Sequence, residues 1–211
     1  MEICTLEHIK KEYRMGELVC PLKDVSLTVN TGDFITVEGP SGIGKSTLLY
    51  VMGTLLQGDG GVYRFEEKDI SRLIQALTLR ENLLFAQRVG EKKRADKKRV
   101  DELLERFGLS DRGGFFPYQL SGGQRRRAMA ARCLIHNPLL ILADEPTNDL
   151  DAHWSEEIVS ELKEESQRRA GVVMVTHDIR WTPEATCRLL LRGGERMAPD
   201  AQIEKKSTER T

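Results

Sequence analysis

The chain has 211 residues, of which 39% are hydrophobic and 31% charged, and its formal net charge is −1. This composition is ordinary for one soluble globular domain with a real core, and it excludes a polyelectrolyte, so nucleic acid is not implied as a partner. No apolar run approaches the roughly 18 residues of a membrane helix, and the N-terminus lacks the layout of a signal peptide, so we expect a cytosolic chain.

The first third of the sequence predicts β-structure, then a glycine loop, a helix and a further strand. The tetrapeptide Asn30-Thr31-Gly32-Asp33 is typical of a tight turn between two strands, and the helix is ended by glycines at residues 58, 60 and 61. The predicted strands and helix are Ile3–Ile9, Val25–Val29, Phe34–Glu38, Ser46–Leu56 (the helix) and Val62–Phe65.

The remainder predicts a helical subdomain and then alternating strands and helices. Helical sequence over Leu79–Phe107, a loop over Leu109–Gln119 and a helix from Ser121 to about His136 form the subdomain. A strand at Leu139–Ala143, a helix at Ala152–Arg169 and a strand at Val172–Thr176 follow. These patterns predict an α/β fold with a mainly parallel sheet, an N-terminal antiparallel β subdomain and a helical subdomain at about 79–136. We expect one domain over residues 1–198 and a frayed tail over 199–211.

The four cysteines are scattered along the chain at Cys4, Cys20, Cys133 and Cys187. Because their spacing is not paired, they suggest neither a disulfide framework nor a zinc site. Buried free thiols are the simpler interpretation.

A glycine-rich loop lies between the strand expected at residues 34–38 and the helix that follows it. It reads Gly39-Pro40-Ser41-Gly42-Ile43-Gly44-Lys45-Ser46 and fits the pattern G-x-x-x-x-G-K-[ST]. Glycines let the backbone turn its N–H groups around a phosphate, and the helix directs its positive dipole end at the same anion. Lys45 would neutralise the β- and γ-phosphates and Ser46 would bind Mg²⁺. By itself the motif indicates phosphate binding, with a chance match as the alternative.

Two adjacent carboxylates, Asp144 and Glu145, end the apolar strand expected at residues 139–143. Because ligands bind beyond the carboxyl ends of parallel strands, we expect both to face the phosphate loop. Neighbours on a strand point in opposite directions, which suits Asp144 to the Mg²⁺ shell and Glu145 to the attacking water. Solvated acids that cap a strand are the alternative.

His177 follows the next expected strand and so reaches the same edge of the sheet. There it would contact the γ-phosphate and hold the water or the base in place. A lone histidine is more often structural, which remains the alternative.

A second glycine motif, Leu120-Ser121-Gly122-Gly123-Gln124, begins the last helix of the subdomain. Ser121 and Gln124 have the spacing of a capping box. Capping does not explain two glycines in the first turn, where each weakens a helix by up to about 1 kcal/mol relative to alanine. Bare N–H groups at a helix N-terminus suit a phosphate that approaches from outside.

These motifs, in this order, resemble the ATP-binding cassette (ABC) ATPases, whose signature motif is LSGGQ. The resemblance extends from about Leu6 to about Arg196, and Val51–Leu55 and Leu142–Thr147 are most similar to the bacterial lipoprotein-release and macrolide-export type. It implies hydrolysis of ATP with Mg²⁺ and a head-to-tail homodimer or pseudo-dimer that encloses two ATP molecules. It also implies a separate transmembrane permease, which would hold this cytoplasmic chain on the inner (plasma) membrane and drive export or lipoprotein release.

The resemblance assigns roles to individual residues. The nucleotide would be held by Gly39, Pro40, Ser41, Gly42, Ile43, Gly44, Lys45, Ser46 and Thr47, and the γ-phosphate of the opposite subunit by Ser121, Gly122, Gly123 and Gln124. The metal-linked residues would be Ser46 and Asp144, the catalytic base Glu145, the switch histidine His177 and the dimer-contact loop Asn148–Asp151. Tyr13 resembles the aromatic that stacks on adenine, although an N-terminal tyrosine is more often a surface aromatic.

The sequence departs from the family pattern after the strand expected at residues 62–65. Family members carry a further helix and a buried strand ending in glutamine, but here Asp69–Ser71 is followed almost at once by Leu77–Asn82. Gln75 is the only glutamine in this interval and lies too close to Leu77 to take the family position. The missing segment is expected to leave a hole in the sheet, and it weakens the expectation of hydrolysis and coupling more than that of ATP binding.

Two other functions share these motifs. The missing segment favours a non-hydrolysing, nucleotide-dependent regulatory module, although the retained Glu145 and His177 argue against it. A DNA-repair or chromosome-structure ATPase head would need a long coiled-coil insertion that the sequence lacks.

Two runs of charge need an interpretation. The run Glu91–Arg99 is better explained by a solvated helix face with i, i+4 pairs than by a nucleic-acid patch. Of the three arginines at 125–127, directly after the signature motif, we expect only one to have a specific role.

Overall fold

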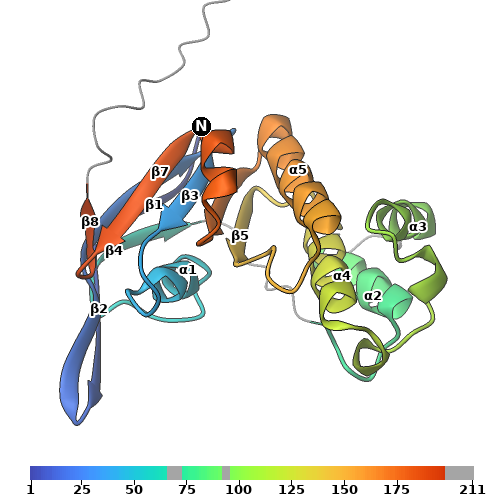
Figure 1. Ribbon diagram of the computed structural model, residues 1–211, viewed down its shortest axis with the longest axis horizontal. Coiled ribbons are helices and arrows are strands. Elements are labelled where there is room, and N and C mark those ends of the chain that lie inside the picture. Colours follow the sequence, from blue (N-terminus) through green and yellow to red (C-terminus); the bar gives the residue numbers. More distant parts are fainter. Residues whose placement is uncertain (66–72, 92–95, 198–211) are drawn as a thin grey trace, which may run out of the picture.

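The computed structural model describes residues 1–65, 73–91 and 96–197 (Figure 1). The strands are β1 (Glu2–Met15), β2 (Glu17–Asn30), β3 (Phe34–Glu38), β4 (Gly60–Phe65), β5 (Leu140–Asp144), β6 (Gly171–Val175), β7 (Cys187–Arg192) and β8 (Glu195–Met197). The α-helices are α1 (Lys45–Met52), α2 (Leu79–Glu91), α3 (Lys97–Arg106), α4 (Gly122–Leu134) and α5 (Ala152–Arg168). Short 3₁₀ helices cover Ser110–Arg112, Pro117–Gln119 and Ile179–Glu184.

The strands form one mixed sheet in the order β4-β1-β2-β8-β7-β3-β6-β5. Strands β7, β3, β6 and β5 pair in parallel, whereas β1 pairs with β2 and β4 in antiparallel fashion. The predicted fold class, with its mainly parallel core and antiparallel N-terminal part, is confirmed. Sequence analysis does not predict β7 or β8, which join the antiparallel part to the parallel part.

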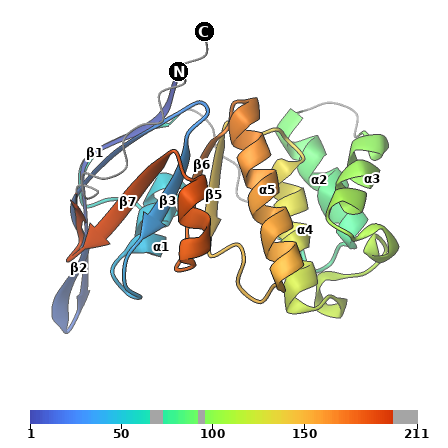
Figure 2. The ribbon, with the colours of Figure 1, turned by 45° about the horizontal axis from the view of Figure 1, so that its top comes forward.

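The sheet separates two hydrophobic cores. Successive residues of β6 alternate between them: Val172 and Met174 pack with α5 and the helical subdomain, whereas Val173 and Val175 pack with α1 and the antiparallel strands. All five residues of β6 are buried, as expected of a parallel strand covered on both faces. In Figure 2, α5, α4 and then α2 and α3 lie progressively farther from the parallel strands.

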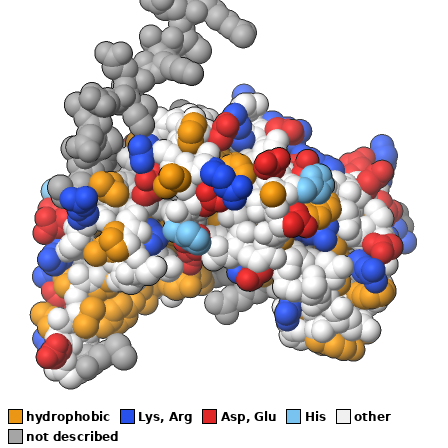
Figure 3. Space-filling model, in the orientation of Figure 1, with side chains coloured by type: hydrophobic (Ala, Val, Ile, Leu, Met, Phe, Trp, Pro, Cys, Tyr) orange, Lys and Arg blue, Asp and Glu red, His pale blue; other side chains and the backbone are white. Residues whose placement is uncertain are grey.

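The first two strands are much longer than the predicted segments and form a hairpin that projects from the molecule. Its turn lies at Gly16, whose φ of 87° is in the left-handed region. Leu18 and Val19 near this turn are 61% and 52% exposed, and hydrophobic side chains gather over the hairpin at the lower left of Figure 3. Pairing between the strands, which local hydrophobicity does not reveal, extends them beyond the core.

Strand β5 is the last strand of the sheet. It pairs with β6 from Leu140 to Asp144, and within the part of the chain that the structure describes no strand pairs with its other side. The predicted hole in the sheet is wrong, because β3 and β6 each have a neighbour on both sides. The predicted residues Asp69–Ser71 lie outside the described residues.

The remaining elements also differ at their ends from the predictions. Helix α1 ends at Met52 rather than Leu56, because Thr54 adopts a left-handed φ of 55° and the chain turns back there. The helical sequence predicted over residues 79–107 forms two helices, α2 and α3, and Asp96 caps α3 by accepting hydrogen bonds from two backbone N–H groups. The predicted i, i+4 pairing is present at Lys98 and Glu102, 3.7 Å apart, while residues 92–95 lie outside the description.

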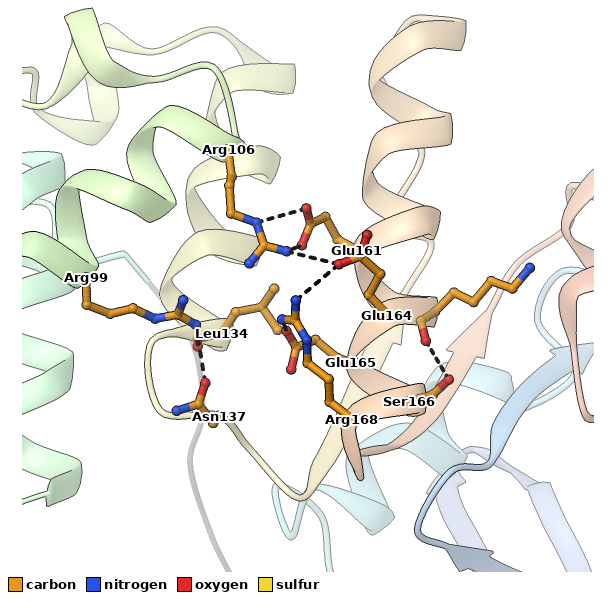
Figure 4. A network of polar contacts seen from close by, with 10 residues as sticks. Arg99, Arg106, Leu134, Asn137, Glu161, Glu164, Glu165, Ser166 and Arg168 are labelled. Carbon is orange, nitrogen blue, oxygen red and sulfur yellow. Dashed lines mark hydrogen bonds and ion pairs between the residues drawn. The ribbon is translucent and has the colours of Figure 1, made fainter.

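A network of ion pairs joins α3 to α5 (Figure 4). The guanidinium of Arg106 on α3 binds both carboxylate oxygens of Glu161 on α5 and lies 3.6 Å from Glu164. Arg168 continues the network to Glu164 and Glu165 at 3.3 and 2.7 Å. This network holds the helical subdomain against the helix that covers the sheet.

Other findings bear on the class of protein. Cys4 is buried, but Cys20, Cys133 and Cys187 are only partly buried, so the expectation of buried thiols is wrong for three of the four. No helix among the described residues combines the length and apolar character needed to cross a bilayer. The predicted tail over 199–211 lies outside the described residues.

Replacing Gly108 with alanine is expected to destabilise the helical subdomain. A Cβ there would lie 2.4 Å from Cη2 of Trp154, and φ is +59°. The left-handed backbone costs about 1–2 kcal/mol and the overpacking about 1–3 kcal/mol, so urea unfolding should lose about 2–5 kcal/mol. Gly114, with nothing within 4 Å of its Cβ position, is the matched control. Equal stability of both alanine variants would contradict the argument.

Candidate functional site

The predicted phosphate loop, Gly39–Ser46, joins the end of β3 to the start of α1. Lys45 is the first residue of α1 and is 8% exposed. Its Nζ donates hydrogen bonds to the carbonyl oxygens of Gly39 and Pro40, at 2.8 and 3.0 Å. The ammonium group is therefore held inside the curve of the loop, where it can meet an anion.

Two glycines of this loop have no room for a side chain. A Cβ on Gly39 would lie 2.6 Å from the carbonyl oxygen of Leu191, and one on Gly44 would lie 2.3 Å from that of Pro21. Their φ values, 146° and 111°, are in the region that favours glycine. Gly44 is the N-cap of α1, and no side chain caps the helix there. Its first-turn N–H groups are therefore directed at the loop, as anion binding requires.

The strand register brings the other predicted residues to the same edge of the sheet. Val37 of β3, Val175 of β6 and Asp144 of β5 form one row across three strands. The chain continues from this row into the phosphate loop, His177 and Glu145 respectively. Sequence analysis predicts each strand end separately, and the strand order places β6, with its histidine, between the loop and the acids.

Asp144 ends β5 with a carboxylate oxygen that lacks a partner. Its Oδ1 is buried and accepts no hydrogen bond from the described residues. A buried carboxylate oxygen is costly unless a proton donor or a cation satisfies it. Together with the hydroxyl of Ser46 in the first turn of α1, it offers the oxygen donors that Mg²⁺ prefers. No group of three or more metal-binding side chains occurs among the described residues, so Mg²⁺ would take its other ligands from phosphate and water.

Glu145 leaves the direction of the strand. Its φ of 48° is left-handed, although its N–H still bonds to the carbonyl oxygen of Val175 at 3.0 Å. The two side chains are predicted to diverge because neighbours on a strand alternate, and this reason is wrong, because β5 ends at Asp144. The backbone turns at Glu145, and this turn directs its side chain.

The carboxylate of Glu145 meets the ring of His177. Nδ1 lies 3.0 Å from Oε2, with the histidine side chain 69% exposed and that of the glutamate 22% exposed. An ionised carboxylate only accepts hydrogen bonds, so this contact places a proton on Nδ1 and leaves Nε2 facing away from the glutamate. The two residues predicted to act together are in contact.

The signature motif begins α4, as predicted. Ser121 Oγ accepts a hydrogen bond from the N–H of Gln124 at 3.2 Å, and Gln124 Oε1 accepts one from the N–H of Ser121 at 2.9 Å. The predicted capping box is therefore confirmed. The motif borders an open, mostly polar depression of about 510 Å³, whose lining residues are Ser121, Gly122, Gly123, Gln124, Arg127, Asp149, Leu150, Asp151 and Trp154.

The two glycines of the signature motif differ in their surroundings. A Cβ on Gly123 would lie 3.2 Å from the carbonyl oxygen of Asp149, so close packing explains that glycine. A Cβ on Gly122 would meet only the Cβ of Asp149, at 3.9 Å. The fold itself therefore leaves room for a side chain at Gly122, and an approaching ligand is a better reason for its absence.

The expectation that one of the three arginines after the motif has a specific role is wrong, because two of them do. Arg127 is buried, and its Nη1 donates to the carbonyl oxygen of Phe107 at 2.6 Å. Its guanidinium stacks on Trp154, 3.8 Å from the ring centroid, and burial lowers its pKa. Arg127 thus fixes α4 to α5.

Arg126 contacts the loop that follows β5. Its Nη1 donates to the carbonyl oxygen of Glu145 at 3.1 Å, and its Nη2 to Asp149 Oδ2 at 3.0 Å. Arg125 is exposed and forms no ion pair with the described residues. The three consecutive arginines indicate a basic start to the helix. The packing of α4 on the loop over residues 145–151, called the acidic loop below, determines that Arg126 is the arginine that binds this loop.

Two further predicted residues lie apart from these contacts. Tyr13 is partly buried on β1, opposite Val19 of the hairpin, with Lys11 Nζ 5.5 Å from its ring centroid. Stacking on adenine stays a prediction. Gln75 is exposed in a turn before α2, and the buried amide of Asn82 holds that turn through the carbonyl oxygens of Ile74 and Leu77. We assign Gln75 no role.

Sequence analysis misses an ion pair directly before the phosphate loop. Arg188 of β7 donates to both carboxylate oxygens of Glu38, at 2.9 and 2.6 Å, and Thr182 donates to the same carboxylate at 3.2 Å. These hydrogen bonds, chiefly those from Arg188, lower the pKa of Glu38. The pair braces the end of β3 from which the loop departs.

This pair predicts a pH dependence of stability. Because the pKa of Glu38 is lower in the folded chain, its contribution is present above the ordinary value of 4.5 and is lost as the pH falls through the folded pKa. Glu38→Gln should therefore be less stable than the wild type near about pH 7, with the gap narrowing towards about pH 4. Urea unfolding at both pH values measures this, and a gap independent of pH would contradict it.

Comparison with known proteins places this site in a family. The family model described as ABC transporter matches residues 22–148. The uncharacterized ABC transporter ATP-binding protein YvrO of Bacillus subtilis (strain 168) is 35% identical over 215 residues, covering 90% of this chain and 94% of that protein. The macrolide export ATP-binding/permease protein MacB of Shigella flexneri is 35% identical over 224 residues. That alignment covers 95% of this chain, which spans about a third of MacB, 35% of its length.

Solved structures of ABC transporter cassettes have the same fold as this chain. A dimeric structure of the bacterial ABC transporter cassette MJ0796 has a TM-score of 0.85 and 31% identity, over 93% of this chain and 97% of that one. A post-hydrolysis dimer of MJ0796 bound to ADP and Pi has a TM-score of 0.83 and 31% identity. With its phosphate loop, acidic strand, histidine and signature motif placed as described, the chain belongs to the ABC transporter family as an ATP-binding cassette.

Proposed function

We propose that this chain hydrolyses ATP as the cytoplasmic cassette of an export or lipoprotein-release transporter, together with a separate membrane permease. The observation that carries the hydrolytic part is the contact between His177 Nδ1 and Glu145 Oε2 at 3.0 Å. Asp144, the preceding residue, has a buried Oδ1 that accepts no hydrogen bond from the described residues. Glu145, His177 and Asp144 follow or end strands at the same sheet edge as the phosphate loop. A base, an imidazole that orients it and a carboxylate able to bind a cation are suited to phosphoryl transfer to water.

The roles follow from the contacts. The loop N–H groups and Lys45 would bind the β- and γ-phosphates, and Ser46 and Asp144 would hold Mg²⁺, which supplies charge neutralisation on the phosphate oxygens. Glu145 would orient the attacking water and accept its proton. His177, which donates to Glu145 through Nδ1, would fix the carboxylate in that position. Tyr13 would stack on the adenine.

A composite site between two copies of the chain accounts for the signature motif. The depression at Ser121–Gln124 includes no residue of the chain's own phosphate loop among its lining residues. The N–H groups in the first turn of α4, where Gly122 has no Cβ to block access, would therefore receive the γ-phosphate held by a second copy or a paralogue. MJ0796 has been described as a dimer, including one with ADP and Pi. We propose that the present chain also dimerises, in the head-to-tail arrangement that the resemblance implies.

The membrane partner is inferred from the relatives. MacB combines ATP-binding and permease parts, and this chain corresponds to about 35% of its length. We therefore propose that a separate permease supplies the membrane part and places the cassette on the inner membrane. We propose the membrane permease, and not a nucleic acid, as the partner of this chain.

Steady-state phosphate release from the full chain tests hydrolysis. The protein is assayed with Mg-ATP and with ATP in excess EDTA, beside a nucleotide-binding titration and Glu145→Gln protein purified in parallel. Mg²⁺-dependent turnover that Glu145→Gln lacks is the expected result. Binding without turnover would overturn hydrolysis and favour the non-hydrolysing regulatory module, and failure to bind nucleotide would overturn both.

A further inference from the structure

We propose that Arg126 is a positioning residue that couples the signature helix to the catalytic glutamate and to the acidic loop after it. This inference rests on the proposed ATPase function. It concerns a side chain with no role in the constellation described so far, and it arises from two hydrogen bonds that cross from α4 to the end of β5.

The two groups that Arg126 binds both belong to strained backbone. Glu145 has a φ of 48° and Asp149 a φ of 59°, and neither residue is glycine. Such conformations cost roughly 1–3 kcal/mol each and persist only where surrounding contacts hold them. One guanidinium donates to the carbonyl oxygen of Glu145 at 3.1 Å and to Asp149 Oδ2 at 3.0 Å. Arg126 therefore spans both ends of the strained segment.

The position of Arg126 in α4 gives its two hydrogen bonds a function. It lies two residues after Gln124, on the helix whose first turn carries the signature motif. The same loop touches that motif a second time, because the carbonyl oxygen of Asp149 would lie 3.2 Å from a Cβ on Gly123. Movement of the signature helix relative to the sheet is therefore transmitted to the backbone of Glu145 through a short, partly buried link.

The geometry of arginine suits this task. The guanidinium is planar and offers several N–H donors in a fixed fork, so it can hold two acceptors at a defined separation. The side chain of Arg126 is 27% exposed and that of Asp149 is 70% exposed, so the Asp149 carboxylate is held by its ion pair with Arg126 and not by burial. We infer that engagement of the signature motif with a nucleotide on the second copy sets the orientation of Glu145 through Arg126.

Kinetics of Arg126→Ala in the full chain test the coupling. A displacement of about 1 Å at a catalytic group can reduce the rate about a hundredfold, so we expect kcat to fall by about tenfold to a hundredfold. The KM for ATP and the thermal midpoint should stay close to those of the wild type. Arg126→Lys, which offers one ammonium in place of the fork, should recover only part of kcat. Arg125→Ala, an exposed neighbour on the same helix turn, is the control and should match the wild type.

A double-mutant cycle separates coupling from simple packing. If Arg126 acts through Asp149, then Arg126→Ala combined with Asp149→Asn should lower kcat no further than Arg126→Ala alone. The inference is overturned if Arg126→Ala keeps the wild-type kcat, if it loses ATP binding and stability together with kcat, or if the two substitutions are additive. An inactive wild type would instead overturn the proposed function, so the two failures are distinguishable.

Discussion

Glu145→Gln is expected to lower steady-state phosphate release by about a hundredfold to ten-thousandfold, the range that general-base catalysis contributes. In the wild type, His177 Nδ1 lies 3.0 Å from Glu145 Oε2. The glutamine amide has the size of the carboxylate, and its oxygen can still accept this hydrogen bond. It cannot take a proton from water. The loss should therefore appear in kcat, while the affinity for ATP is kept, because no phosphate contact is removed.

A matched control exists on α5. Glu157 is exposed and is not one of the residues assigned to the site, so Glu157→Gln removes the same charge from the chain at a position outside the proposed machinery. Phosphate release and nucleotide titration on both variants make the comparison. If Glu145→Gln retained more than about a tenth of the wild-type turnover, Glu145 would not be the base.

Lys45→Ala is expected to weaken nucleotide binding by about tenfold to a hundredfold, since a charge-assisted hydrogen bond contributes about 1.5–3 kcal/mol. In the structure the ammonium group bonds to the carbonyl oxygens of Gly39 and Pro40 at 2.8 and 3.0 Å. It is therefore positioned by the loop itself, and an alanine leaves the loop without its only buried positive charge among the described residues 39–46.

The measurement is a titration with a fluorescent ATP analogue, with and without Mg²⁺. Lys97→Ala, at an exposed position on α3, removes the same charge elsewhere and should bind like the wild type. Thermal unfolding in the absence of nucleotide shows whether Lys45→Ala keeps its fold. Equal affinities for the two alanine variants would remove Lys45 from the proposed site.

Much of the site follows from local sequence. The phosphate loop, the capping box of Ser121 and Gln124, and the parallel strands β3, β5 and β6 lie within one or two residues of the predicted positions. Each depends on a pattern of neighbouring residues, such as glycines at left-handed positions or a Ser/Gln pair three residues apart, that acts over a single turn or strand.

Other features were missed because they depend on contacts between distant segments. The hairpin of β1 and β2 is longer than either hydrophobic segment, because the strands hydrogen-bond to each other outside the core. The ion pair of Glu38 with Arg188 joins residues 150 positions apart. Strand β8 is three residues long and owes its pairing to β7. No local periodicity carries this information.

The sequence by itself determined the chemistry available to this protein: a loop for phosphate, two acids, a histidine and a signature motif, each placed at a strand end or a helix start. The tertiary structure decided which of them meet. Because β6 lies between β3 and β5, His177 reaches Glu145. Because α4 packs on the acidic loop, Arg126 rather than Arg125 binds it. Strand order and helix packing are set by burial over the whole chain, and a local pattern therefore names the groups without fixing their contacts.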